Sequence, residues 1–119
     1  MKIQIVGMDK LQKTLNNMSP KVYNAVEKEL KIITLDLQGK AQQLAPVDTG
    51  DLKGSAFADV SGPVGTVGFT EPYALRQHES MGFKHPKGGE AKYLENPYKE
   101  NKDKYIDAIK DAAKKAVEP

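Results

Sequence analysis

The chain contains no cysteine, which excludes disulfide bonds, thiol chemistry and metal sites built on thiolates. It also lacks any apolar run near the ~20 residues that a membrane-spanning helix needs. The first residues, Met1–Val6, carry one lysine and no long apolar stretch, which does not fit a secretory signal peptide. These absences predict a soluble protein that is made in the cytoplasm and has no membrane partner.

A strong excess of one charge is also missing. Eighteen basic residues nearly balance sixteen acidic ones, and the formal net charge is +2. A dedicated duplex-DNA binder normally concentrates basic residues, because its affinity comes largely from neutralising phosphates. The overall charge therefore argues against that class, although a local basic segment remains open.

The usual signatures of catalysis are absent. There is no Gly-x-Ser-x-Gly elbow and no Gly-x-x-x-x-Gly-Lys phosphate loop, and neither His78 nor His85 lies in a recognisable nucleophile motif. We expect both histidines to lie on the surface. Asp48 and Asp51 could pair for acid–base chemistry, but turn formation and helix capping explain both more simply.

A metal site could be imagined from four residues between positions 78 and 90. His78, Glu79, His85 and Glu90 follow one another at spacings of 1, 6 and 5, which match no standard ligand pattern. We therefore predict no metal, no cofactor and no catalytic residue, and we expect that the protein is not an enzyme.

The composition is that of one ordinary globular domain over residues 1–119. Hydrophobic residues make up 39% of the chain and charged residues 29%, values typical of soluble domains. A chain of this size buries about two-thirds of its extended surface on folding. That is enough for one modest core.

A long amphipathic helix is the clearest element. Ser19 and Pro20 form its predicted start, since serine caps exposed amides and proline suits the first helical position. Apolar residues then recur at spacings of 4, 4, 3, 4, 4 and 3, and Ala25 and Ile32 are expected to widen this stripe, which comprises Val22, Val26, Leu30, Ile33, Leu37, Ala41 and Leu44. Pro46 ends the helix, because the residue before a proline avoids the helical region. About 25 residues span roughly 37 Å, which is long for a domain with an expected radius of gyration near ~14 Å. Its ends must overhang the core or meet another chain.

The remaining pattern predicts an α+β fold, with a small antiparallel sheet packed against the long helix and a C-terminal helix. We expect a strand over residues 2–6, a short helix after Asp9 and one helical turn over residues 51–53. Strands over residues 55–61 and 64–69 would form a hairpin through Gly62-Pro63, followed by a short helix over residues 73–79. The last helix is predicted from about Tyr98 to Val117, with its buried stripe at Tyr105, Ile109, Ala112 and Ala116 and with Ile106, Ala113 and Val117 beside it.

Residues 80–90 are rich in glycine, histidine and lysine and predict a long loop. Loops of this length in small domains are often functional. The wider segment 76–92 is locally basic and could touch DNA phosphates or an acidic protein surface; its basic residues are Arg76, Lys84, Lys87 and Lys92. A solvated loop is the simpler interpretation. Tyr93 and Tyr98 could stack on bases, but anchoring of the C-terminal helix explains them more simply.

One segment carries a family resemblance. The run Ala45-Pro46-Val47-Asp48-Thr49-Gly50-Asp51-Leu52, followed by Lys53 and preceded by a long helix, resembles the gp-ten-like minor tail-component or head–tail joining proteins of long-tailed phages and prophages. The later family features are matched by Tyr73-Ala74 and Glu79 and then by Leu94 and Pro97. The resemblance covers nearly the whole chain in order. It departs after Glu79, where this chain has Ser80-Met81-Gly82-Phe83.

The resemblance implies a small structural subunit of a bacteriophage virion, without catalysis. Such a subunit would form a ring, often a hexamer, at the neck or at the upper end of the tail tube, where it joins head to tail or completes the tail. Its partners would be copies of itself and the connector, neck and tail-tube proteins, while DNA passes nearby without specific binding. Its turn motif would be Pro46, Asp48, Thr49, Gly50 and Leu52, and the candidate partner contacts are Tyr73, Arg76, Glu79, Lys84, His85 and Lys87.

Two other functions stay open on the residues alone. The first is a small nucleic-acid-binding protein that uses the basic segment 76–92. The second is a metal-dependent enzyme that uses His78 and His85. The sequence leaves undecided which faces form the interfaces, whether the subunit sits at the neck or at the tail end, and what residues 80–90 do.

Overall fold

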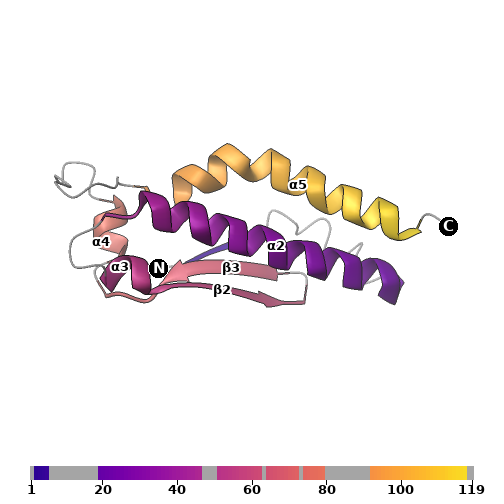
Figure 1. The fold of residues 1–119 in the computed structure, drawn as a ribbon, viewed down its shortest axis with the longest axis horizontal. Coiled ribbons are helices and arrows are strands. Elements are labelled where there is room, and N and C mark those ends of the chain that lie inside the picture. Colours follow the sequence, from indigo (N-terminus) through magenta and orange to yellow (C-terminus); the bar gives the residue numbers. More distant parts are fainter. Residues whose placement is uncertain are drawn as a thin grey trace.

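The computed structural model describes residues 2–5, 19–46, 51–62, 64–72, 74–79 and 92–117, with residues 2–5 and 75–77 described by their backbone alone. Its elements in chain order are β1 (Lys2–Ile5), α2 (Pro20–Leu44), α3 (Asp51–Gly54), β2 (Ala56–Ser61), β3 (Val64–Phe69), α4 (Ala74–Glu79) and α5 (Glu95–Val117). Figure 1 shows α2 between α5 on one side and the sheet on the other. The predicted α+β class is confirmed. The helix predicted after Asp9 lies outside the described residues.

Helix α2 begins and ends where the sequence predicts. The Ser19 side chain accepts a hydrogen bond of 3.4 Å from the Val22 N–H, and Pro20 opens the helix. The helix ends at Leu44 because Ala45, which precedes Pro46, adopts the extended conformation with ψ 139°. The Ala45 N–H still donates to the Ala41 carbonyl at 2.9 Å, so it has a partner at the helix end.

The buried stripe of α2 forms the centre of the core. Six of the seven predicted residues are buried: Val22, Val26, Leu30, Ile33, Leu37 and Ala41. Leu44 is half-buried and packs against the same cluster. Thr34 is buried beside them, and its hydroxyl donates to the Leu30 carbonyl at 2.9 Å. The prediction for Ile32 is wrong: its side chain is 56% exposed, because it lies at the rim of the contact with α5 rather than beneath it.

The sheet has the strand order β1-β3-β2, and both pairings are antiparallel. On β3, Val67 and Phe69 are fully buried in the core that α2 contributes to. Their register partners on β2 are Ala58 and Ala56, which pack on the same cluster. The predicted hairpin is confirmed. Gly62 in its turn has φ +57°, the left-handed region that glycine enters at little cost.

Helix α5 starts earlier than the sequence predicts. It begins at Glu95 rather than near Tyr98, and Pro97 lies in its first turn. Proline is tolerated there because the first amides of a helix have no partner within it. Tyr105 and Ile109 are buried as expected, whereas Val117 at the far end is 67% exposed.

The molecule is elongated. Its extents are 54 × 22 × 20 Å and its radius of gyration is 16.0 Å, above the ~14 Å typical of a compact chain of this length. Helix α2 sets the long axis, and its N-terminal end extends past the hairpin turn (Figure 1). No helix among the described residues is both long and apolar enough to cross a membrane.

Candidate functional site

The described part of the predicted turn motif lies at one end of the molecule. Pro46 follows the end of α2, Leu52 lies in α3, and both side chains are buried. Helix α4, which carries Glu79, and the start of α5 lie at the same end (Figure 1, left). We call this region, formed by the C-terminal end of α2, by α3 and α4 and by the first turn of α5, the motif end. Asp48, Thr49 and Gly50 lie outside the described residues.

The corner between α2 and α3 is held by side-chain bonds to the backbone. The Gln42 amide donates to the Lys53 carbonyl at 3.1 Å, which ties the last turns of α2 to α3. The Ser55 hydroxyl donates to the Leu52 carbonyl at 2.8 Å. Both carbonyls lie near the end of α3, where a carbonyl has no partner inside the helix. These bonds hold the corner between α2 and α3 in place.

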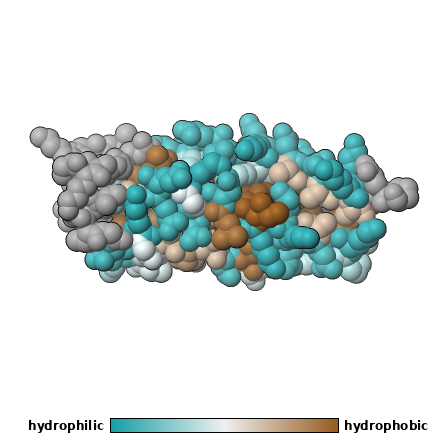
Figure 2. Space-filling view, in the orientation of Figure 1, coloured by the Kyte–Doolittle hydropathy of each residue, from teal (hydrophilic) through white to brown (hydrophobic). Residues whose placement is uncertain are grey.

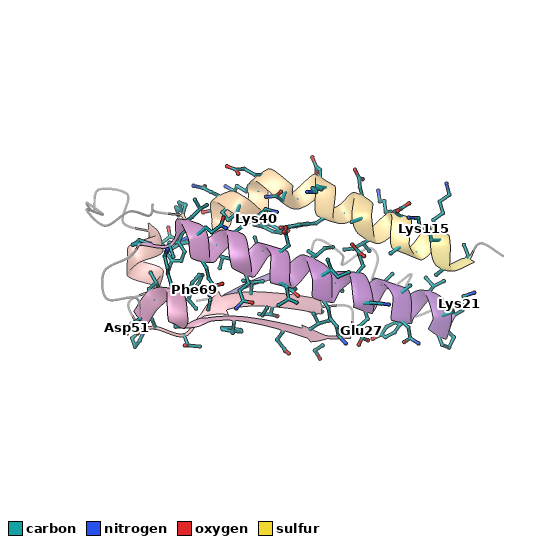
Figure 3. All side chains as sticks on the ribbon, in the orientation of Figure 1. Lys21, Glu27, Lys40, Asp51, Phe69 and Lys115 are labelled. Atoms are coloured by element: carbon teal, nitrogen blue, oxygen red, sulfur yellow. The ribbon has the colours of Figure 1, made fainter. Side chains whose placement is uncertain are left out.

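Tyr93 anchors α5 to α4. It is fully buried, and its hydroxyl donates to the Ala74 carbonyl at 2.6 Å. Its ring meets Phe69 edge-on, with centroids 5.0 Å apart, and meets His78 in the same way at 5.1 Å. Such edge-on pairs are favourable for aromatic rings. The anchoring role predicted for Tyr93 is what the described contacts show. Figure 3 places Phe69 beside α2, toward this end.

The prediction that His78 lies on the surface is wrong. The residue is only 4% exposed, and its Nε2 accepts a hydrogen bond of 3.2 Å from the Glu95 N–H, the first amide of α5. Because Nε2 accepts, this network assigns the ring proton to Nδ1, which lies 2.9 Å from Glu79 Oε1 and donates to it. His78 therefore caps α5 as an inter-helix partner. The sequence pattern does not predict that His78 is buried, since a histidine on a polar helix is normally expected to be exposed.

A network of charges surrounds the entry to α5. The Lys92 ammonium group pairs with Glu79 and lies 3.4 Å from Glu95 Oε2, and Glu95 also pairs with Lys99 at 2.8 Å. The bond to Lys92, followed by that to His78, lowers the pKa of Glu79, and the bond to Glu79 raises the pKa of Lys92. The bond to Lys99 is the main cause of the lowered pKa of Glu95. Lys92 has φ +57°, which lies in the left-handed region that residues other than glycine rarely adopt.

The structure describes only some of the residues predicted to contact a partner. Tyr73, Lys84, His85 and Lys87 lie outside the described residues, and only the backbone of Arg76 is described, within α4. Glu79 is exposed at the motif end but is also bonded within the chain. Of the metal set considered above, His85 and Glu90 lie outside the description. Among the residues described, no group of three histidine or acidic side chains could hold a metal ion.

Sequence reasoning missed a polar node between α2 and α5. The Tyr105 hydroxyl donates to Asp36 Oδ2 at 2.6 Å, Lys40 donates to the same oxygen, and the Lys40 Nζ lies 5.8 Å from the centre of the Tyr105 ring. Figure 3 shows Lys40 on the side of α2 that faces α5. The bond from Lys40, followed by that from Tyr105, lowers the pKa of Asp36, while burial and then Asp36 raise the pKa of Tyr105.

The outer face of α2 carries two exposed aliphatic residues. Ile32 is 56% exposed and Leu35 is 62% exposed, and residues three apart are neighbours on a helix surface. Figure 2 shows hydrophobic atoms gathered midway along this face, over the middle of α2. Ile32 borders a groove toward α5, and Leu35 borders a groove toward β2.

A search of protein-family models, characterised proteins and solved structures found no match to this chain.

Proposed function

We propose that the protein is a non-catalytic structural subunit of a tailed phage or prophage, which joins head to tail or completes the tail end within an oligomeric ring. The observation that carries the proposal is the location of the matched residues. Pro46 and Leu52 from the turn motif and Leu94 and Pro97 from the entry to α5 are all buried. They come from distant parts of the chain, and the elements that carry them, the C-terminal end of α2, α3 and the start of α5, lie toward one end of the molecule (Figure 1).

The shape of the subunit supports a role in assembly. Ring subunits join head to tail through two different patches on each chain. An elongated body of 54 Å offers such patches at the motif end and along the outer face of α2. The motif end is also the part of the described chain where charged groups are most densely paired with one another.

The nucleic-acid alternative draws less support from the described residues. Of its four basic residues, Lys92 is the one whose side chain is described, and two carboxylates already neutralise it. A phosphate would have to displace Glu79 and Glu95 before it could bind there. Arg76, Lys84 and Lys87 lie outside the described side chains. A filter-binding titration against duplex and single-stranded DNA at low salt would test this alternative directly.

Reconstitution with the neighbouring virion proteins tests the proposal. Genes for portal, connector or tail-tube proteins beside this one would identify the partners, and the purified proteins would be mixed and imaged by cryo-electron microscopy. We expect ring-shaped particles that contain this chain. Arg76→Glu should weaken ring formation if α4 contacts the partner. The matched charge reversal Lys110→Glu, at an exposed position of α5, should leave ring formation unchanged. Failure to associate with any neck or tail protein of the same phage would overturn the proposal.

A further inference from the structure

Strand β2 is an edge of the described sheet, and every second residue along it points its backbone N–H and C=O groups away from β3. The strand order is β1-β3-β2, so among the described strands β2 pairs with β3 alone. The Ser55 carbonyl accepts from the Thr70 N–H at 3.1 Å, in continuation of the β2–β3 register. Hydrogen-bonded pairs recur at every second residue of an antiparallel ladder. The N–H and C=O groups of Phe57, Asp59 and Ser61 therefore face β3, and those of Ala56, Ala58 and Val60 face outward.

This edge lacks the usual protection against strand pairing. Natural edge strands carry lysine, proline, a bulge or a covering segment. Within the described chain, β2 has none of these, and its one charged residue is Asp59, on the face opposite α2. The side chains of Ala58 and Val60 face α2 but are only half-buried, because no described strand lies beyond them.

A groove runs beside the open edge. Leu35 of α2 is 62% exposed and lines this groove with Thr34, Ala58 and Val60, and the charged residues Lys31 and Asp59 complete the lining. Toward the motif end, a second groove on the same side of α2 is lined by Gly39 and Gly54. An added Cβ at either glycine would meet no atom within 4 Å. A glycine inside a helix lowers its stability, and none of the described residues fills the space beside Gly39.

The sequence of β2 suits pairing with itself in one register. A two-fold axis at Ala58 places Ala58 opposite its own copy and Ala56 opposite Val60, and all of these residues have outward-facing backbone groups. This arrangement engages every outward N–H and C=O of the strand, whereas axes at Phe57 or Asp59 engage fewer. It also places Asp59 opposite Phe57. An axis at Asp59 would instead set two carboxylates face to face, which is destabilising.

We infer that two copies of this chain associate through their β2 edges about a two-fold axis at Ala58, with Leu35 of each α2 covering the junction. The result is a continuous antiparallel sheet with both α2 helices on one face. A two-fold contact uses the same patch on both chains and cannot close a ring by itself. The inference is therefore independent of the proposed function, and the failure of one leaves the other standing.

Sedimentation velocity over a concentration series gives the first test. Because the contact is one short strand and one apolar side chain, we expect a weak dimer, with a dissociation constant on the order of 10–100 µM, and a mass about twice 13.1 kDa. Leu35→Lys should weaken it by at least roughly tenfold. Ile32→Lys is the matched control, since Ile32 is equally aliphatic and exposed but borders α5. A chain that stays monomeric up to about 1 mM, or a dimer equally sensitive to both substitutions, overturns the inference.

A cysteine cross-link tests the register. The chain contains no cysteine, so Ala58→Cys can link only to its own copy. Hydrogen-bonded antiparallel partners have Cα atoms about 5.5 Å apart, which is within the range for a disulfide. We expect Ala58→Cys to give a covalent dimer on mild oxidation and Phe57→Cys to give little. The reverse order, or a link that forms equally at both positions, contradicts the register.

A proline substitution separates folding from pairing. The Ala58 N–H does not bond to β3, so Ala58→Pro removes an outward donor from an edge strand, where proline is tolerated. We expect a circular dichroism spectrum like that of the wild type together with loss of the dimer. If the variant unfolds, Leu35→Lys on the exposed face of α2 still decides the matter. Capture of β2 by a strand of a different protein in place of a second copy would also overturn the inference.

Discussion

The Tyr105 hydroxyl of α5 donates a 2.6 Å hydrogen bond to the carboxylate of Asp36 on α2, 69 residues away in sequence. The same oxygen also accepts from Lys40. The hydrogen bond from Tyr105 joins the two long helices, and the Lys40 ammonium group above the Tyr105 ring adds a second polar contact between them. This node fixes the rotation and the axial position of α5 relative to α2, which apolar contacts alone specify less sharply.

Tyr105→Phe tests the strength of this node. The substitution keeps the buried ring and removes one hydrogen bond to a half-exposed carboxylate, so we expect a loss of about 1 kcal/mol in the free energy of unfolding. Asp36→Asn should cost a similar amount, and the double variant should cost less than the sum, because the two groups share one interaction. Urea denaturation of the four proteins measures this. Strict additivity would show that the bond contributes nothing.

The two pKa shifts predict opposite pH limits. The folded pKa of Asp36 is below its ordinary value of about 3.9, so its contribution is present above that value and is lost as the pH falls through the folded pKa. The folded pKa of Tyr105 is raised above about 10, so its contribution is present below pH 10 or so and is lost as the pH rises further. Denaturation series should show Asp36→Asn reducing the acid dependence and Tyr105→Phe reducing the alkaline dependence. Unchanged slopes would contradict the assignments.

His78→Phe tests the cap of α5. The substitution keeps a ring edge-on to Tyr93 but leaves the Glu95 N–H without its acceptor, and we expect a loss of about 2 kcal/mol. His78→Gln can still accept from that amide and should lose less. Glu79→Gln is a control for the carboxylate that accepts from the other ring nitrogen. A thermal melt that ranks the glutamine variant at position 78 below the phenylalanine variant would show that ring packing, not capping, is the role of His78.

Two substitutions at Lys92 distinguish the cost of its backbone conformation from the contribution of its ion pairs. Lys92→Ala removes the pairs with Glu79 and Glu95 and keeps a Cβ at φ +57°. Lys92→Gly removes the same pairs and relieves the left-handed conformation. We therefore expect the glycine variant to melt a few degrees above the alanine variant. Equal melting temperatures would mean that the local backbone relaxes when the lysine is lost.

Gly39→Ala should stabilise the isolated chain. Glycine inside a helix is about 1 kcal/mol less favourable than alanine, and no atom lies within 4 Å of the added Cβ. Denaturant unfolding at low protein concentration, where the chain is monomeric, measures the gain. A loss of stability would show that α2 needs the flexibility of a glycine at this position.

Periodicity made most of the fold predictable. The α2 stripe from Val22 to Ala41 repeats at the helical period over many turns, and such a pattern has few other ways to bury itself. The signals at its ends are equally local, with Ser19-Pro20 at the start and Ala45-Pro46 at the stop. The hairpin through Gly62 was predictable for the same reason, since its turn residues fix the pairing of the strands on either side.

The misassigned residues depend on distant contacts. Ile32 fits the helical stripe as well as Ile33 does, and only the position of α5 decides which of the two is covered. His78 is buried because Tyr93 and the start of α5 pack over it, which local pattern does not encode. The earlier start of α5 has the same origin, since the first amide of the helix bonds to His78 rather than to a neighbour in sequence. The turn motif, by contrast, is a contiguous run in the sequence, and its two described residues, Pro46 and Leu52, are both buried.

The backbone bond from the Lys92 N–H to the His78 carbonyl, 2.7 Å long, joins the two points where residues 80–91 leave and rejoin the described chain. Adding residues between two joined ends costs mainly closure entropy, about 0.6 kcal/mol for each doubling of the length that is closed. The bond therefore makes the contact of α4 with the start of α5 insensitive to how many residues connect them, and an epitope or affinity tag inserted between these two points should leave both helices in place.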